Sequence, residues 1–392
     1  MTPATARYHR AVPRPSGVAS ARATRKPASR AARYPRHIAP PVLVEVHRGS
    51  IIESRHRGHV VQVSATGEVD RAIGDPEVPV TLRSAVKPFA LVALIESGAA
   101  DDLRLSGPEL AVMAASHMGE DKHIRTLQAV FRRAGVSQSL LTCGSVGMPM
   151  DKVTAMRLAR DGEAPGAIRH QCSGFHAASI LLSRFSDWSL EDYDQPGHPS
   201  QVAVRAAVAK VFGVRVSELE VAVDDCGLGT YAFPLVDVAR AFALLADPSS
   251  ASDPVRVAMA PALTRIRDAM IGAPEMVGGT DGSLDTMLMQ HLKGKVVSKG
   301  GAEGLRGVGV LPGARGTGRP AVGLAVRIDD GDGYARANRA VTMEALSQLG
   351  VIDDRARRAL AAQHRPVTRS LAGDLIAETI PEFLLAPISE LG

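Results

Sequence analysis

The sequence has few cysteines, no long apolar run and no acidic residue near its start, and each shortage narrows the possible classes of protein. Its three cysteines, Cys143, Cys172 and Cys226, are odd in number and far apart. They do not form a disulfide framework, which favours a reducing, cytoplasmic setting. No run approaches the roughly 18 apolar residues that a membrane-spanning helix needs. There is also no internal repeat, no phosphate-binding loop and no Cys-x-x-Cys metal-ligand pair.

Acidic residues are absent from residues 1–40, which contain nine Lys and Arg. The remainder then holds 37 basic and 41 acidic residues, so it is mildly acidic although the whole chain carries +5. Nucleic-acid binding by the folded part is therefore not expected. The segment is rich in Arg, Ala, Ser and Pro, which predicts a disordered extension. An organelle transit peptide and a tether to an anionic surface are the alternatives.

The rest of the chain, residues 41–392, has the composition of a globular protein with a large core, since 45% of the sequence is hydrophobic and 22% charged. Apolar alternation in residues 42–65, broken at Gly49 and Gly58, predicts two or three strands. Amphipathic and apolar helical stretches follow, so the fold class is α/β (α+β). From about residue 351 we expect a short helix and an irregular C-terminal wrap.

Ser84 and Lys87 lie three residues apart before an apolar run that starts at Phe89. A serine hydroxyl needs a neighbouring base to act as a nucleophile, and a lysine can be that base when desolvation or nearby positive charge keeps it neutral. Since the residue before a proline avoids the α region, we expect both in the turn that enters a helix near Pro88. A helix cap beside a surface lysine is the alternative.

A second serine, Ser116, follows a nearly all-apolar helix that starts with Ser106 as cap and Glu109 at its third position. Polar residues that leave a buried helix need partners, so Ser116, His117 and the nearby Glu120 are candidate site residues. A satisfied helix terminus explains them equally well.

Other candidates lie where polar residues meet buried elements. Cys172 enters an apolar helix, and Asp224, Asp225 and Cys226 follow an apolar strand. Lys299 lies on a predicted strand that leads into two glycines, which allow a substrate to approach the backbone. The alternatives are a buried structural cysteine and a hairpin turn.

Six motifs, RSAVKP, ASHMGE, HQCSGFH, DDCGLGTYAFPL, GGTDGSLDTMLM and SKGGAEG, occur in an order that resembles the thermolabile, rhizobial-type (class 3) L-asparaginases. The resemblance covers roughly residues 42–350. It implies a fold like that of serine β-lactamases and penicillin-binding proteins, with a central antiparallel sheet flanked by helices. It also implies a homodimer. The mildly acidic body and the lack of a long apolar run indicate no nucleic-acid or membrane partner.

The resemblance further implies an amidohydrolase that converts L-asparagine to L-aspartate and ammonia through an acyl-enzyme. Its two Ser-Lys pairs correspond to Ser84 with Lys87 and to Ser116 with Lys299. Neutral lysines would move the protons. We favour Ser116 as nucleophile because it leaves a buried helix, although the sequence does not decide between the two serines.

The implied substrate-binding residues are Arg83, His117, His176 and Asp224. Arginine and aspartate suit the α-carboxylate and α-ammonium of an amino acid. The resemblance also implies a zinc site of two cysteines, Cys172 and Cys226, and a lysine.

At the position of that lysine this sequence has Phe175, which offers no lone pair, so water, His176 or Asp224 would have to complete a zinc site. Asp225 stands where glycine is usual. These departures leave two alternatives to an asparaginase. One is an enzyme of the same scaffold that acts on another amide or amino-acid derivative, and the other is a non-catalytic amino-acid-binding protein.

Overall fold

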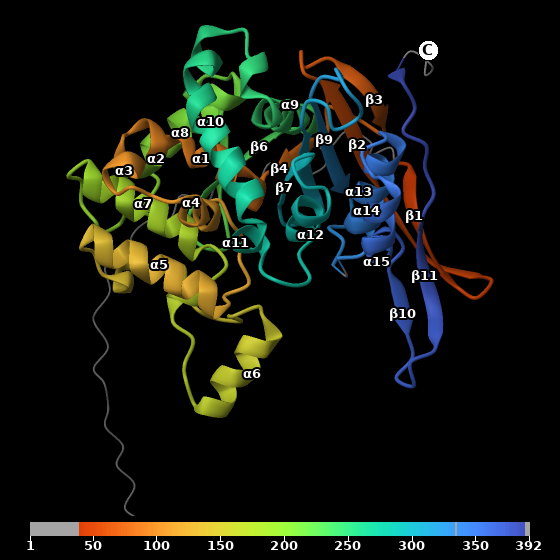
Figure 1. The fold of residues 1–392 in the computed structure, drawn as a ribbon, viewed down its shortest axis with the longest axis horizontal. Helices are drawn as coiled ribbons and strands as arrows, with labels where there is room; N and C mark the ends of the chain where they lie inside the picture. Colours follow the sequence, from red (N-terminus) through yellow and green to blue (C-terminus); the bar gives the residue numbers. More distant parts are fainter. Residues whose placement is uncertain (1–38, 334, 389–392) are drawn as a thin grey trace, which may run out of the picture. The chain divides into compact units, whose positions relative to one another are not determined.

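The computed structural model describes residues 39–333 and 335–388. The basic extension predicted for residues 1–40 lies outside the described residues except for its last two. From Pro40 onward the chain forms one unit that combines an antiparallel sheet with two groups of helices (Figure 1). No helix in the described ranges is long and apolar enough to cross a membrane.

Eight strands of the described chain form the main sheet, and every neighbouring pair is antiparallel. In spatial order they are β10 (Val367–Arg369), β11 (Leu375–Pro381), β1 (Val42–Arg48), β2 (Ile51–Ser64), β9 (Val322–Ile328), β8 (Leu305–Val310) and β7 (Val296–Gly300), with β3 (Val69–Ile73) paired to β2 outside this order. This sheet and its flanking helices confirm the predicted fold class, mixed α/β with a central antiparallel sheet.

The two or three strands expected in residues 42–65 are confirmed as two, β1 and β2. The break expected at Gly58 is wrong, since β2 runs through this residue. A Cβ at Gly58 would lie 2.1 Å from the carbonyl oxygen of Arg327 on β9. Glycine is thus needed at this position for close approach of two strands. The irregular wrap expected after residue 351 instead contains β10 and β11, and β11 pairs with β1.

A second sheet within the described residues has three strands, in the order β4 (Pro79–Thr81), β6 (Gly229–Pro234) and β5 (Glu220–Val223). The turn between β5 and β6 contains Asp224, Asp225 and Cys226. A hydrogen bond from the Asp224 amide to the Leu228 carbonyl closes this turn at 2.8 Å. The small sheet therefore fixes the acidic residues and the thiol predicted as site residues.

Helices form a separate group beside the sheet (Figure 1). They are α1 (Lys87–Ala90), α2 (Val92–Glu96), α3 (Ala99–Asp102), α4 (Gly107–Met113), α5 (Asp121–Ala134), α6 (Lys152–Asp161), α7 (Ser173–Phe185), α8 (Pro199–Phe212), α10 (Pro254–Gly272) and α11 (Pro274–Gly278). The predicted cap of α4 is confirmed, since Ser106 and Glu109 form a capping box.

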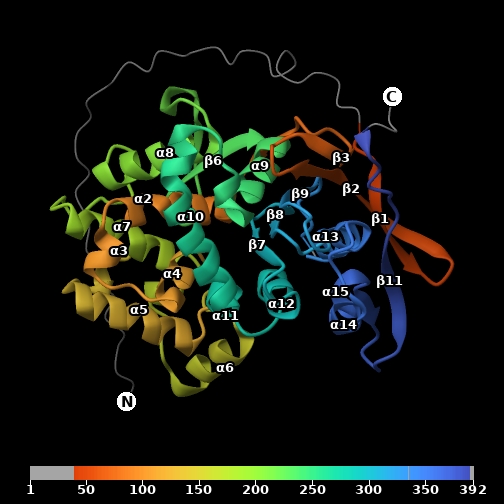
Figure 2. The same ribbon diagram turned by 45° about the horizontal axis from the view of Figure 1, so that its top comes forward.

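The remaining helices cover the two faces of the sheet (Figures 1 and 2). They are α9 (Leu235–Ala246) on the face toward the helical group, and α12 (Leu284–His291), α13 (Ala337–Gln348), α14 (Asp354–Ala359) and α15 (Ala361–His364) on the other. Residues of β9 alternate between two hydrophobic cores, with Ala325 in the first and Leu324 and Val326 in the second. The sheet is thus buried on both faces.

Glycines let α9 approach the sheet closely. A Cβ at Gly323 would lie 1.8 Å from the Ala239 carbonyl oxygen, and one at Gly307 would lie 2.0 Å from the Phe242 ring. Since both are far below any real contact distance, larger residues would force the helix away from β8 and β9. Glycine in these strands serves packing rather than flexibility.

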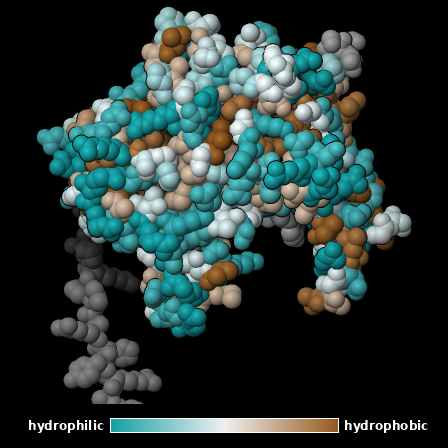
Figure 3. All heavy atoms as spheres, viewed as in Figure 1, coloured by the Kyte–Doolittle hydropathy of each residue, from teal (hydrophilic) through white to brown (hydrophobic). Residues whose placement is uncertain are grey.

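The face of the molecule in Figure 3 is mainly hydrophilic, and its hydrophobic residues are scattered. Exposed apolar side chains include Val153 and Met156 of α6 and Leu371 between β10 and β11. Single exposed apolar residues are normal on protein surfaces and do not by themselves indicate a partner.

Candidate active site

Ser84 and Lys87 lie at the junction of the small sheet and the helical group. Arg83–Val86 form a single 3-10 turn that leads directly into α1, so Ser84 lies in the expected turn. The placement of Lys87 in the turn is wrong, because Lys87 has αR backbone angles and begins the helix despite the proline that follows it. Arg83 has a positive φ of 48°, which is uncommon for a residue with a side chain. Its amide donates to Thr230 Oγ1 of β6 at 2.9 Å, so the neighbouring sheet holds this strained backbone in place.

Ser116 follows the buried helix α4, as predicted. Its amide donates to the Val277 carbonyl at 3.1 Å, and the amide of His117 donates to the Gln171 carbonyl at 3.2 Å. These bonds to two other segments fix the backbone on both sides of the hydroxyl. The serine is therefore held rigidly at the point where the chain leaves the core.

Both lysines converge on Ser116. Lys87 Nζ donates to the Ala115 carbonyl at 2.7 Å and lies 3.3 Å from Ser116 Oγ. Lys299 Nζ, on β7, lies 3.0 Å from the same oxygen. The two lysine side chains are only 2% and 1% exposed. The pair of Ser116 with Lys299 has the predicted geometry, whereas no hydrogen bond within the described residues joins Ser84 Oγ to Lys87.

Lys299 has an unusual protonation equilibrium. Burial, opposed by Asp285 but reinforced by Lys87 and Arg306, lowers its pKa to about 7. Two ammonium groups near one serine repel each other, so the loss of one proton relieves the repulsion. Lys299 can therefore exchange a proton with Ser116 near neutral pH, which is the property required of a general base.

Asp285 and Arg306 hold the strand that carries Lys299 in place. Asp285 accepts hydrogen bonds from Ser298 Oγ at 2.6 Å and from the Gly300 amide at 2.9 Å, on either side of Lys299, and it forms an ion pair with Arg306. Burial favours protonation of Asp285, but the nearby Arg306 and Lys299 charges and these hydrogen bonds outweigh it, so its pKa is lowered. It is thus a buried carboxylate that fixes the strand carrying Lys299.

The cysteines predicted as metal ligands lie beside Lys87. Cys172 Sγ is 3.2 Å from Lys87 Nζ, and both Cys172 and Cys226 are free and buried. A hydrogen bond from Cys226 lowers the pKa of Cys172 although burial opposes this, and the same bond raises the pKa of Cys226. The two shifts have opposite directions, so Cys172, the sulfur that contacts Lys87, is the one of the pair that favours the thiolate form.

These donors do not make up a zinc site. Among the described residues, no group of three or more His, Cys, Asp and Glu is placed to hold a metal ion. The Phe175 ring is buried in the apolar core and offers no lone pair. With only two sulfurs, and Lys87 already bonded to one of them, the tetrahedral donor set of structural zinc is incomplete.

Arg83 and Asp224, the predicted partners of the substrate's charges, contact each other. Arg83 Nε donates to Asp224 Oδ1 at 2.5 Å, and a second guanidinium nitrogen is bonded to Asp225. The Asp225 side chain is 88% exposed and that of Asp224 only 11%. Two carboxylates therefore share one arginine at the mouth of the site.

The two predicted histidines are placed in the interior. His117 donates from Nε2 to Ser173 Oγ at 2.9 Å, because its Nδ1 accepts from the Gly119 amide. His176 Nδ1 accepts from the Tyr193 hydroxyl at 2.6 Å. Burial lowers the pKa of both rings, that of His176 to about 4. Both are fully buried and neither lines the cavity at Ser116, so they are placed to support its walls.

A cavity of about 340 Å³ opens above Ser116 and has the size of a small-molecule site. Residues from separate motifs line it: Arg83, Ser84, Ser116, Cys172, Asp224, Cys226 and Lys299. The structure thus brings together the main predicted site residues, including Lys87, which contacts Ser116 but does not line the cavity. His117 and His176 stay outside this group.

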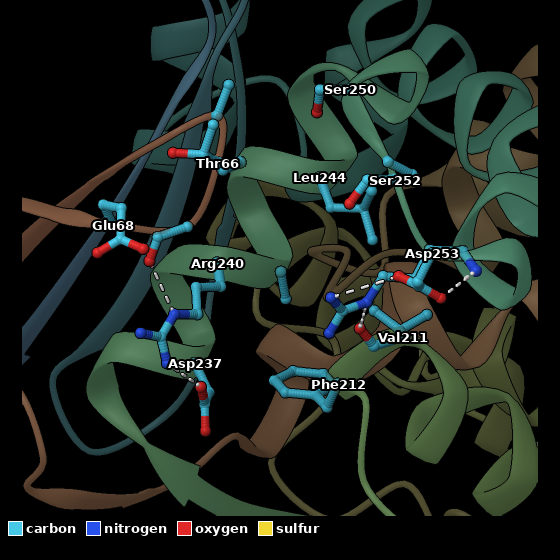
Figure 4. Close-up of a pocket in the computed structure, with 16 residues that line it drawn as sticks. Thr66, Glu68, Val211, Phe212, Asp237, Arg240, Leu244, Ser250, Ser252 and Asp253 are labelled. Atoms are coloured by element: carbon cyan, nitrogen blue, oxygen red, sulfur yellow. Dashed lines mark hydrogen bonds and ion pairs between the residues drawn. The ribbon is translucent and has the colours of Figure 1, made fainter.

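Figure 4 shows a different cavity, of about 350 Å³, between α9 and the loop that follows β2. None of the predicted site residues lines it. Its arginines are already paired: Arg240 with Asp237 at 2.9 Å, and Arg256 with Asp253 at 3.6 Å. No lysine, histidine or cysteine lines this cavity, so it lacks the serine–lysine contact found at Ser116. The candidate active site is therefore the one at Ser116.

Three charged residues of the site were not singled out in the sequence. Asp285 lies in the GGTDGSLDTMLM motif, so the motif itself was a signal for it. Arg306 on β8 and Arg339 on α13 also line the cavity, but both come from segments without a motif. Only the packing of β8 and α13 near β7 brings them to the site.

A family model described as L-asparaginase II matches residues 44–380 of the chain. The comparison with curated proteins returned no match. Among solved structures, a probable glutaminase from Bacillus subtilis is 13% identical, with 75% of this chain and 88% of that chain covered and a TM-score of 0.36. The covalent complex of a Bacillus subtilis glutaminase with 5-oxo-L-norleucine is 12% identical, with 75% and 89% covered and a TM-score of 0.35.

Proposed function

The chain belongs to the L-asparaginase II family and is an amidohydrolase, and from this premise we propose that it hydrolyses L-asparagine to L-aspartate and ammonia with Ser116 as nucleophile. The observation that carries the proposal is the contact of Ser116 Oγ with Lys299 Nζ at 3.0 Å, because the pKa of this lysine is about 7. Ser84 lines the same cavity and is the competing nucleophile.

In the first half-reaction, neutral Lys299 takes the proton of Ser116 while Oγ attacks the side-chain amide carbon of asparagine. The tetrahedral intermediate then loses ammonia, whose nitrogen receives the proton from Lys299, and a β-aspartyl ester of Ser116 remains. In the second half-reaction Lys299 deprotonates a water that attacks the ester. Aspartate leaves, and Ser116 regains its proton.

Lys87 supports this chemistry as a fixed cation. An ammonium has three N–H donors, and each finds an acceptor here: the Ala115 carbonyl, Ser116 Oγ and Cys172 Sγ. Its charge beside Ser116 Oγ stabilises the negative charge that develops on this oxygen. The contact with Cys172 Sγ at 3.2 Å helps to keep Lys87 in this position.

The test is ammonia release from L-asparagine by the full chain and by two matched variants, Ser116→Ala and Ser84→Ala. We expect Ser116→Ala to lose about 10³-fold or more in kcat and to form no ester, and Ser84→Ala to retain an ester on Ser116, both followed by intact mass. An ester that persists in Ser116→Ala and vanishes in Ser84→Ala would reverse the two roles.

Folded protein that releases no ammonia from asparagine would refute the proposal. Activity on glutamine or on another amide would then identify an enzyme with an altered substrate. Asparagine binding without turnover would identify a binding protein.

A further inference from the structure

Some of the charged side chains that line the cavity at Ser116 form ion pairs with one another, and others have no oppositely charged partner in contact. Arg83 is bonded to both Asp224 and Asp225, and Arg306 forms a buried ion pair with Asp285. Because one arginine faces two carboxylates, the mouth of the site carries an excess negative charge. The side near β7 lacks such an excess.

Arg339, on α13, is the exception among the arginines of this cavity. Nη1 donates to Gln363 Oε1 and Nη2 to the Gly282 carbonyl, both at 2.5 Å, and both acceptors are neutral. Within residues 39–333 and 335–388, no carboxylate lies within ion-pair distance of its guanidinium. The arginines of the cavity in Figure 4 make a direct contrast, since Arg240 and Arg256 each have an aspartate partner.

A half-buried guanidinium with no carboxylate in contact is energetically unfavourable. Burial and the nearby Arg306 lower the pKa of Arg339, and the charges of Asp332 and Asp285, which do not contact it, offset this only in part. Of its five N–H donors, the two bonds above use two. The remaining three are enough for a bidentate interaction with a carboxylate. The Gly282 and Gln363 contacts hold the guanidinium in position before any ligand arrives.

We propose that Arg339 binds the α-carboxylate of the substrate and that the Asp224–Asp225 pair receives its α-ammonium group. The cavity then has a positive group at Arg339 and a negative pair at its mouth, with Ser116 in the same cavity, and it selects the amide of an α-amino acid. This assignment rests on the proposed function and moves the carboxylate-binding role from Arg83, which is occupied by two aspartates, to Arg339.

Two truncated amides separate the two charge contacts. Succinamic acid is asparagine without its amino group, and 3-aminopropanamide is asparagine without its α-carboxylate. We expect Arg339→Gln to raise KM about 10- to 100-fold for L-asparagine and succinamate, and to leave 3-aminopropanamide unchanged. Asp224→Asn should show the opposite pattern, with succinamate unaffected.

Arg240→Gln, in the cavity of Figure 4, is the matched control and should change none of the three KM values. Arg339→Lys keeps the charge without the bidentate geometry, so it should recover part of the loss. It also covers the case in which Arg339→Gln does not fold. An equal change for asparagine and 3-aminopropanamide in both Arg339 variants would overturn the proposal, because a merely structural role affects every substrate alike.

Failure of the proposed function can be told apart from failure of the Arg339 proposal, because the wild-type protein itself would then release no ammonia from asparagine. In that case calorimetric binding of L-aspartate and of 3-aminopropanamide tests Arg339 without turnover. We expect Arg339→Gln to weaken aspartate binding about 10- to 100-fold and to leave the amine unchanged. Aspartate that binds equally to wild type and variant, or to neither, would overturn the proposal.

Discussion

Lys299 Nζ lies 3.0 Å from Ser116 Oγ, although the two residues are 183 positions apart and come from different parts of the fold, strand β7 and the end of helix α4. The lysine also donates to the Gly300 carbonyl at 2.8 Å, so its amine cannot turn freely away from the serine. Burial lowers its pKa to about 7, so this single contact joins the proposed nucleophile to an amine that is neutral above that pH.

The pH dependence of activity should report this lysine. Only neutral Lys299 can take the Ser116 proton, so kcat/KM should be low at acidic pH, rise through a midpoint near 7 and then level off. The profile is measured with L-asparagine from pH 5 to 9, with ammonia as the readout. A value of kcat/KM that is still rising at pH 9, with no midpoint in this range, would show that Lys299 has an ordinary pKa and is not the base.

Lys299→Met should abolish activity and stabilise the protein. The folded-state pKa lies below the model-compound value of 10.5, so the folded state disfavours the proton that the unfolded state holds. This penalty is full below pH 7, decreases between pH 7 and 10.5, and is absent above. The gain in unfolding free energy should be roughly 2–3 kcal/mol larger at pH 6 than at pH 9.

Urea denaturation of wild type and variant at both pH values measures this difference. Methionine keeps the length of the side chain, which limits the effect of a cavity. A gain that is equal at the two pH values would contradict the assigned protonation behaviour.

Asp285→Asn should shift the pH profile as well as weaken the fold. Since the Asp285 charge raises the pKa of Lys299, its removal should move the midpoint of kcat/KM to lower pH. Because the substitution leaves Arg306 without its buried partner, we expect a loss of about 3–5 kcal/mol in unfolding free energy. The two effects are measured separately, by the pH profile and by urea denaturation. If stability falls but the midpoint of the pH profile does not change, Asp285 has only a structural role.

Zinc should be substoichiometric in the purified protein, and a chelator should leave the rate unchanged. The two thiols lack further ligands among the described residues, and Lys87 already contacts Cys172 Sγ. Metal content by mass spectrometry, before and after chelation, checks this. Phe175→Lys restores the lysine that the resemblance places in the zinc site, and this variant is the matched comparison. If zinc is present only in that variant, Phe175 is the reason that the wild type binds none. One zinc per chain in the wild type would contradict the incomplete donor set.

The parts of the fold that depend on neighbouring residues could be predicted from the sequence. The capping box of Ser106 with Glu109 and the helix stop at Gly135, with a φ of 67°, involve contacts within one turn. Strand β11 could not be predicted in this way, because it pairs with β1 from more than 300 residues away. Within β11 only two of seven residues, Ala377 and Thr379, are buried, so the segment shows no regular alternation of apolar and polar residues.

The site shows the same division. Motif order indicated Ser84, Ser116 and Lys299, yet it assigned Lys87 to Ser84, whereas the packing of α1 against the end of α4 brings Lys87 to Ser116. Arg339 has no local signal, because its role depends on which arginines of the cavity find carboxylates. Such pairings are set by the tertiary structure and cannot be predicted from one amino-acid sequence.

Gly174 should be required for the close contact of α7 with α4, the helix that ends before Ser116. A Cβ at Gly174 would lie 2.0 Å from the Val112 carbonyl oxygen, so Gly174→Ala must push the two helices apart. We expect a loss of about 1–3 kcal/mol in unfolding free energy and a lower kcat, because the shift displaces Ser116 from Lys299. Gly166→Ala is the matched control, since nothing lies within 4 Å of its added methyl group and its φ is not positive. If both variants unfold at the same urea concentration, the close approach does not constrain the fold.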